Sequence, residues 1–86
     1  MNSNLEEMIE YMNPDALKAD GFDDAIIGFA EQAGRPPVLA YDSDKCIEKL
    51  MSDGMTMEEA MEYFEFNISS AYMGENTPIF ITKVND

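Results

Sequence analysis

The chain has 86 residues, of which 18 are acidic, five are basic and none is histidine, so its net charge at neutral pH is −13. A chain of this length forms one small domain, and its hydrophobic fraction of 45% is too high for a disordered acidic segment. Such a charge repels nucleic acid and anionic membranes and attracts basic partners. We therefore expect neither direct nucleic-acid binding nor membrane binding.

The sequence also indicates where the protein works. Cys46 is the single cysteine, so no disulfide can form within the chain. The N-terminal residues lack the basic and apolar regions of a signal peptide, and no segment approaches the ~20 apolar residues of a membrane span. We expect a cytoplasmic protein.

The first 22 residues are predicted to form a helical extension. A capping box at residues 3–6 is followed by apolar residues at helical spacing, which predicts a helix over 4–12. Asn13 and the proline after it fit the start of a second short helix that ends at Gly21. We expect this extension to pack on the main domain, residues 23–86.

A β-hairpin is predicted at the start of the main domain. Residues 25–31 (AIIGFAE) and 36–42 (PPVLAYD) are short apolar runs with β-branched or aromatic members, and turn-forming residues separate them. Gly28, inside the first run, indicates a bulge or a close backbone contact. A helix over 23–33 is the competing interpretation, because Ala, Glu and Gln are good helix formers.

Two helices are predicted after the hairpin. Residues 42–43 offer an N-cap for a helix over 44–53. A capping box at residues 56–59 opens a longer helix, which we expect to run to Met73 because glycine follows there.

The final segment, IFITKV at residues 79–84, has β-branched residues at alternate positions and is predicted to be a strand. The predicted fold class is α+β. We expect a small three-stranded, mainly antiparallel sheet packed by two helices, with the N-terminal helical extension covering an exposed side.

Several short motifs occur once each along the main domain, in this order: Asp24-Ala25-Ile26 with Gly28, Pro37-Val38 with Tyr41-Asp42, Gly54-Met55-Thr56 with Glu58-Glu59-Ala60, Asn67, and Gly74-Glu75 with Thr77-Pro78. In these motifs, over residues 23–82, the chain resembles a group of small, acidic, uncharacterised proteins of tailed bacteriophages. The resemblance implies expression inside a bacterial host cell. It implies no catalytic or binding residue.

The reactive residue types do not fit an enzyme. Histidine, the usual general base at neutral pH, is absent, and Cys46 falls on the apolar face of its predicted helix, which is typical of a core residue. Residues 42–53 match a calcium loop at three acidic positions, but Ile47 stands where that loop needs glycine. Asp42 and Asp44 are interpreted as residues at the start of a helix, with a magnesium site as the weaker alternative. We expect no enzymatic activity, no bound metal and no cofactor.

The helix that begins after residue 56 has two apolar sides. With successive residues about 100° apart, its core side gathers Met57, Ala60, Met61, Phe64, Ile68 and Ala71, with Tyr72 at the edge. Asn67 borders this side. We expect its partly buried amide to bind the backbone of residues 74–77 or of a nearby strand end.

The second side of this helix carries the predicted binding site. Aromatic and apolar side chains stand there among carboxylates, and the predicted partner-binding residues are Glu58, Glu59, Glu62, Tyr63, Glu65, Phe66 and Met73. In one interpretation the N-terminal helix covers Phe66, which then belongs to a satellite of the core. In the other, Phe66 is exposed and anchors a partner inside a charged rim.

Two functions fit this second side. The first is a phage protein that binds the basic surface of a host protein, as an inhibitor or a nucleic-acid mimic. Glu58, Glu62 and Glu65 span ~10 Å of helix, in which duplex DNA places about six phosphates, so a mimic needs acids from neighbouring helices as well. The alternative is a structural or accessory homodimer with the Phe66 side as its interface.

Overall fold

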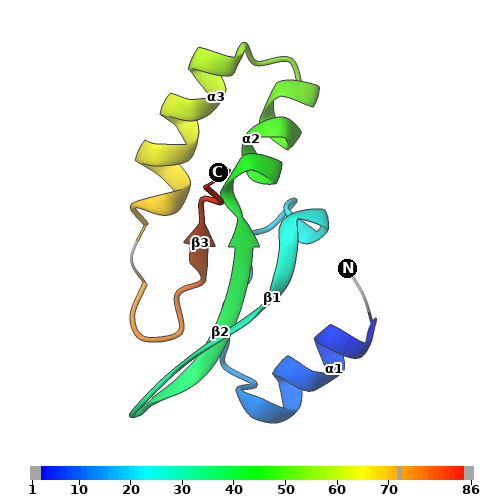
Figure 1. Cartoon of the computed structure of the whole chain (residues 1–86), viewed down its shortest axis with the longest axis vertical. Helices are drawn as coiled ribbons and strands as arrows, with labels where there is room; N and C mark the ends of the chain where they lie inside the picture. Colours follow the sequence, from blue (N-terminus) through cyan, green and yellow to red (C-terminus); the bar gives the residue numbers. More distant parts are fainter. Residues whose placement is uncertain (1–2, 72, 85–86) are drawn as a thin grey trace.

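The predicted β-hairpin lies at the centre of the structure, a computed structural model that describes residues 3–71 and 73–84 (Figure 1). Strands β1 (Ile26–Gln32) and β2 (Arg35–Asp42) pair in antiparallel fashion. Ile26 pairs with Tyr41 and Gly28 with Ala40, so one extra residue stands between them, as in a β-bulge. The bulge at Gly28 is confirmed. The competing helix over 23–33 is wrong, since only a single 3₁₀ turn, η1 (Asp23–Ala25), forms there.

The third strand, β3 (Ile79–Ile81), pairs with β2 in parallel, and the strand order is β1-β2-β3. The predicted α+β class with three strands is confirmed. The sheet is mixed, with the antiparallel pair longer than the parallel one. β3 has three residues and is shorter than the six-residue segment, 79–84, that was predicted as a strand.

The core lies between one face of this sheet and the helices. Leu39 and Tyr41 point to that face of β2 and are fully buried. The ring of Phe80 on β3 lies 5.4 Å from the ring of Tyr41 and 5.3 Å, edge-on, from the ring of Phe64, measured between centroids. Aromatic pairs at these separations prefer such tilted arrangements. The rings therefore join the sheet to the helical layer.

The N-terminal helix α1 (Ser3–Met12) forms as predicted and packs against β2. Its residue Ile9 is buried and belongs to the same hydrophobic cluster as Leu39 and Tyr41. The division of the chain at residue 22 stays a prediction about the domain boundary.

The second N-terminal helix, predicted from Asn13 to Gly21, is wrong. Residues 13–22 form an irregular segment with two turns. The side chain of Asn13 is buried and donates to Pro37 O at 2.8 Å and to Asn76 Oδ1 at 3.0 Å. Its own Oδ1 accepts from the backbone N–H of Asp15 at 3.2 Å. This amide forms an Asx turn instead of a helix cap, and the irregular chain is held by tertiary bonds.

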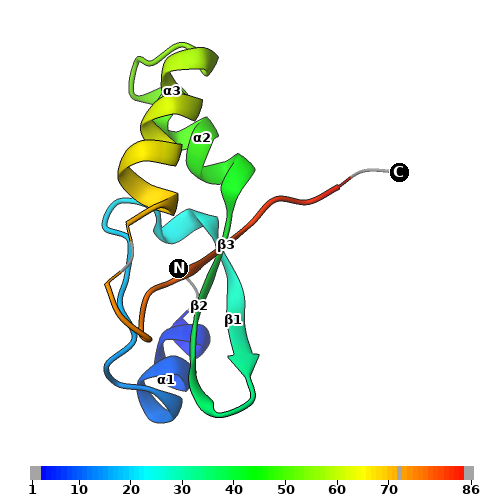
Figure 2. The same ribbon diagram turned by 90° about the vertical axis from the view of Figure 1, so that its left-hand side faces the viewer.

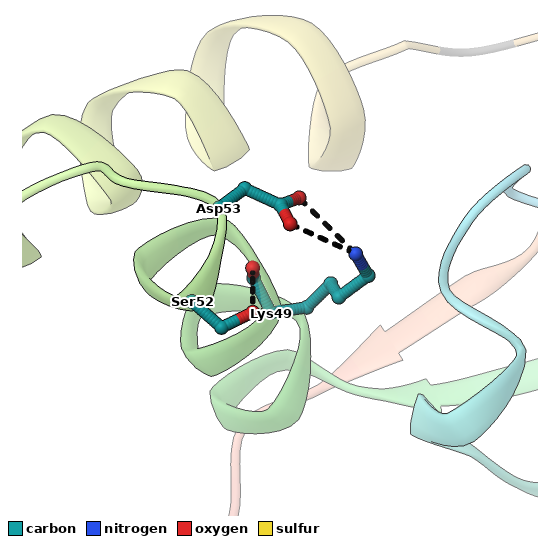
Figure 3. A network of polar contacts seen from close by, with 3 residues as sticks. All are labelled: Lys49, Ser52 and Asp53. Atoms are coloured by element: carbon teal, nitrogen blue, oxygen red, sulfur yellow. Dashed lines mark hydrogen bonds and ion pairs between the residues drawn. The ribbon is translucent and has the colours of Figure 1, made fainter.

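The next helix, α2 (Ser43–Ser52), begins at the predicted cap, because Asp42 Oδ1 accepts the backbone N–H groups of Asp44 and Lys45. Its last turn carries a small polar network (Figure 3). Lys49 Nζ lies 3.0 Å from Asp53 Oδ1, and Ser52 Oγ donates to Lys49 O at 2.7 Å. These bonds engage groups at the end of the helix, where backbone carbonyls lack helical partners.

The following helix, α3 (Met57–Phe64), opens on the predicted capping box between Thr56 and Glu59. It continues as one π-helical stretch, η2 (Glu65–Ser69), and ends there instead of at Met73. Residues 67–70 are Asn, Ile, Ser and Ser, which are weaker helix formers than the residues before them. None of the helices in the described ranges has the length and apolar character that crossing a membrane requires.

Candidate partner-binding surface on α3

Only a narrow stripe of α3 is buried. Ala60 and Phe64 are in the core as predicted, but Met57 and Met61 are 61% and 48% exposed, and Ala71 is exposed too. Figure 1 shows the reason: α2 and α3 stand together beyond one end of the sheet, so α3 packs mainly against α2. A helix with one helical neighbour buries less of its surface than a helix lying across a sheet.

Phe66 is open to solvent. Its exposure is 76%, and α1 lies at the opposite end of the molecule, beside the lower half of β2 (Figure 1). The interpretation in which α1 covers Phe66 is therefore wrong. Exposure of this ring costs the fold its burial energy, about 2 kcal/mol for a phenylalanine.

Four of the predicted residues meet at one hollow of about 340 Å³. Its lining comprises Met55, Glu59, Glu62, Tyr63, Phe66 and Asn67. Tyr63 is 44% exposed and supplies, with Phe66, the aromatic part of this lining. We call these six residues the α3 surface.

The other three predicted residues lie elsewhere. Glu65 lines a different hollow, of about 380 Å³, together with Met61 and Phe64. Glu58 is exposed but lines neither hollow, and it shares a strip of the helix with Glu62 and Glu65 by their spacing. Glu62 lines the first hollow and Glu65 the second, and we call these two carboxylates with Glu58 the acidic ridge.

Met73 does not join this surface. It follows the end of the π-helical stretch, is 71% exposed, and donates its backbone N–H to Thr77 Oγ1 at 2.7 Å in the turn before β3. The sequence placed Met73 near Phe66 on the assumption of an unbroken α-helix. A π-helical stretch holds more residues per turn and changes the direction of every later side chain.

Asn67 is not the predicted buried clamp. It is exposed, and its Nδ2 donates to Tyr63 O, one turn back in the same helix, at 3.3 Å. The bond supports the end of the helix, and Asn67 also lines the hollow. Asn13 is the buried amide that joins distant segments.

The negative charge of the α3 surface is not neutralised by neighbouring bases. Three of the five basic residues form ion pairs away from α3: Lys18 with Glu6, Lys49 with Asp53, and Lys83 with Asp42. In the described ranges, none of the ion pairs reaches a carboxylate of α3. Bonds from the backbone and side chain of Thr56 lower the pKa of Glu59 from its usual value, which keeps this carboxylate ionised.

Cys46 and the acids near it form no visible reactive centre. Cys46 is fully buried, and burial, with a smaller effect of the Asp42 charge, raises the pKa of its thiol to about 11. Among residues 3–71 and 73–84, no group of three or more acidic or cysteine side chains is placed to hold a metal ion.

The sequence did not single out Met55 as a site residue. It stands directly before the capping residue of α3, where an apolar residue often packs onto the first turn of the helix. That pattern was a usable signal.

No protein-family model, no curated protein and no solved structure matches the chain. The function proposed below therefore depends on the residues of this chain.

Proposed function

We propose that this chain is a non-enzymatic protein-binding module whose α3 surface docks on a basic surface of another protein. The observation that carries the proposal is the exposed ring of Phe66, which shares a hollow with Tyr63 and two glutamates. Exposed aromatic residues inside a polar rim are typical anchors of protein interfaces.

The electrostatics select the kind of partner. Glu59 and Glu62 border the rings, and the chain as a whole carries −13. A lysine or arginine placed over the face of Phe66 or Tyr63 gains a cation–π attraction as well as the attraction of both carboxylates. A basic partner is therefore bound in two ways, and an acidic one is repelled.

The resemblance to phage proteins suggests which class of host protein offers the basic surface. A phage product in the cytoplasm of a bacterial host meets many proteins whose basic surfaces bind nucleic acid. Occupying such a surface inhibits its owner. The ridge of Glu58, Glu62 and Glu65 supplies charge for this role at lower density than a duplex, so the aromatic anchor has to supply much of the affinity.

A homodimer through the same surface is the alternative. Two copies that met there would bring the carboxylates of both helices together without a base to separate them. Like charges placed face to face oppose association. The charge distribution thus favours a basic partner.

The test begins with affinity capture from a bacterial host lysate at low and high salt, followed by binding measurements on the purified partner. Phe66→Ala should weaken binding by a factor of about 30, the effect of losing a hot-spot residue worth about 2 kcal/mol. Affinity should also fall as salt is added.

Tyr11→Ala is the matched control. Tyr11 is 90% exposed among glutamates, but it lies on α1, far from the α3 surface. Its removal should leave binding unchanged. Equal losses for the two variants, or binding that is indifferent to salt, would contradict the proposal.

A further inference from the structure

The hollow of the α3 surface has negative charge but none of the chain's own cations. Of the described residues that line it, Glu59 and Glu62 are acidic and none is basic. The two bases that form no ion pair within the described ranges, Arg35 and Lys45, line other hollows. Arg35 begins β2 at the hairpin turn, which lies at the end of the molecule opposite α3 (Figure 2). A cation for this hollow therefore has to come from another molecule.

One of the two carboxylates is held in place by the start of α3. Glu59 Oε1 accepts the backbone N–H of Thr56 at 2.9 Å, and the backbone N–H of Glu59 donates to Thr56 Oγ1 at 3.2 Å. Within the described ranges, no ion pair engages its other oxygen, Oε2. A side chain that is already fixed loses little conformational entropy when it accepts a further bond. Glu59 is thus a prepared acceptor for a cationic donor.

The aromatic rings lie one helical turn from the carboxylates. Tyr63 follows Glu59 by four residues, and Phe66 follows Glu62 by four. This spacing brings side chains to about 5–6 Å from each other on one side of a helix, measured between Cβ atoms. Both rings are accessible, at 44% and 76% exposure. A cation over either ring is therefore also near a carboxylate.

We propose that this hollow binds the side chain of an arginine of the basic partner, in preference to a lysine. A guanidinium is flat and weakly hydrated, so it can stack on the ring of Phe66 while the N–H groups in its plane donate to the carboxylates. An ammonium is a strongly hydrated point charge without a flat face, and it cannot do both. Met55 and Tyr63 offer apolar contacts for the arginine methylenes. This preference rests on the proposed function, because the arginine belongs to the basic partner described there.

The test compares the binding of two synthetic peptides of equal length and charge to the purified whole chain. One peptide alternates glycine with arginine, and the other has lysine in place of every arginine. We expect the arginine peptide to bind about tenfold more tightly at the same salt concentration, because its side chains can stack and donate at once. Equal affinities, or no binding of the arginine peptide, would overturn the proposal.

Two substitutions that remove one charge each compare the hollow with the helix around it. Glu59→Gln keeps an oxygen for the Thr56 N–H, since glutamine also serves at this position of a capping box. It should weaken binding of the arginine peptide by about fivefold or more. Glu58→Gln removes a charge from the same turn, at an exposed residue that lines neither hollow beside α3, and should change the affinity by less than about twofold. Equal losses would mean that only net charge matters and would overturn the proposal.

Phe66→Leu tests the flat face of the ring. Leucine keeps an apolar side chain at this exposed position but has no π system, so circular dichroism should show an unchanged fold. The preference for arginine over lysine should fall from about tenfold to about twofold or less. A preference that survives this substitution would place the arginine elsewhere and overturn the proposal.

The arginine preference and the proposed function can fail separately. A lysine peptide that binds as tightly as the arginine peptide, depends on Phe66 and is weakened by salt would reject the arginine preference and leave the basic partner in place. A partner captured from the lysate that binds Phe66→Ala as well as it binds the wild type would reject the proposed function and the arginine preference together.

Discussion

At the scale of single residues, Asn13 does the most to connect distant parts of the chain. Its buried amide joins the end of α1 to β2 and to the turn before β3, through Pro37 O and Asn76 Oδ1. Burial of a polar group is tolerated only when the group is hydrogen-bonded. Removing Asn13 also leaves the groups that it bonded without a hydrogen-bond partner.

Asn13→Ala should therefore lower the free energy of unfolding by about 2 to 3 kcal/mol, measured by urea denaturation. The matched control is Asn67→Ala, which removes an exposed amide with one bond of 3.3 Å and should change stability by less than about 0.5 kcal/mol. A larger effect at Asn67 than at Asn13 would restore the sequence-based assignment of Asn67 as the structural clamp.

At the scale of elements, α2 depends on its cap. Asp42 is buried, and burial alone would raise its pKa. The backbone N–H groups of Lys45 and Asp44, with the Lys83 ammonium, outweigh this effect and lower the pKa from its usual 3.8. The ionised carboxylate is thus bound more strongly in the folded state than in the unfolded one.

Two substitutions separate the cap from the charge. Asp42→Ala should cost about 1 to 2 kcal/mol in unfolding free energy, and Asp42→Asn should cost less, because asparagine keeps an oxygen for the helix N-terminus. The folded pKa is lowered, so the contribution of the charge is present above pH ~3.8 and disappears as pH falls through the folded value. Unfolding curves of the wild type and Asp42→Asn should differ at neutral pH and converge in acid. A difference that stays constant with pH would contradict a stabilising role of the Asp42 charge.

The beginnings of elements were predictable from sequence because they depend on local bonds. Asp42 and the Thr56–Glu59 box cap α2 and α3 with side chains two or three residues away. The end of α3 was not predictable from the sequence. Gly74 resembles a helix stop signal, but the π-helical stretch ends the helix five residues earlier, at Ser69. Asn13 also resembles a cap, but its bonds to Pro37 and Asn76 are long-range, so a local pattern does not reveal them.

The candidate site also has one property that local sequence determines and one that depends on long-range packing. Glu59, Glu62, Tyr63 and Phe66 come together because spacings of three and four residues place them on one side of α3 and its continuation. Whether α1 covers Phe66 depended on where α1 packs, and Ile9 places it against the core beside β2. The grouping of the residues was readable from helical spacing, whereas their exposure required the tertiary structure.

At the scale of the whole molecule, the charge is strongly one-sided. The chain carries −13, and in the described ranges none of the ion pairs reaches a carboxylate of the α3 surface.

The net charge of −13 also acts within each molecule. Carboxylates that repel one another in the folded chain are farther apart when it unfolds, so self-repulsion lowers the stability of the folded state. Attraction within ion pairs offsets little of this repulsion, because the Lys18–Glu6 and Lys49–Asp53 pairs are both well exposed to solvent. Screening should therefore stabilise this protein.

We expect the melting temperature to rise as sodium chloride is added, by about 4 to 8 °C if screening contributes about 1 kcal/mol in a domain of this size. The measurement belongs at low protein concentration, where the effect of salt is intramolecular. Magnesium chloride at the same ionic strength should give a similar rise, because no cluster of ligands for a metal ion occurs in the described ranges. A much larger rise with magnesium would reveal a specific cation site, and a fall with sodium chloride would show that ion pairs outweigh the repulsion.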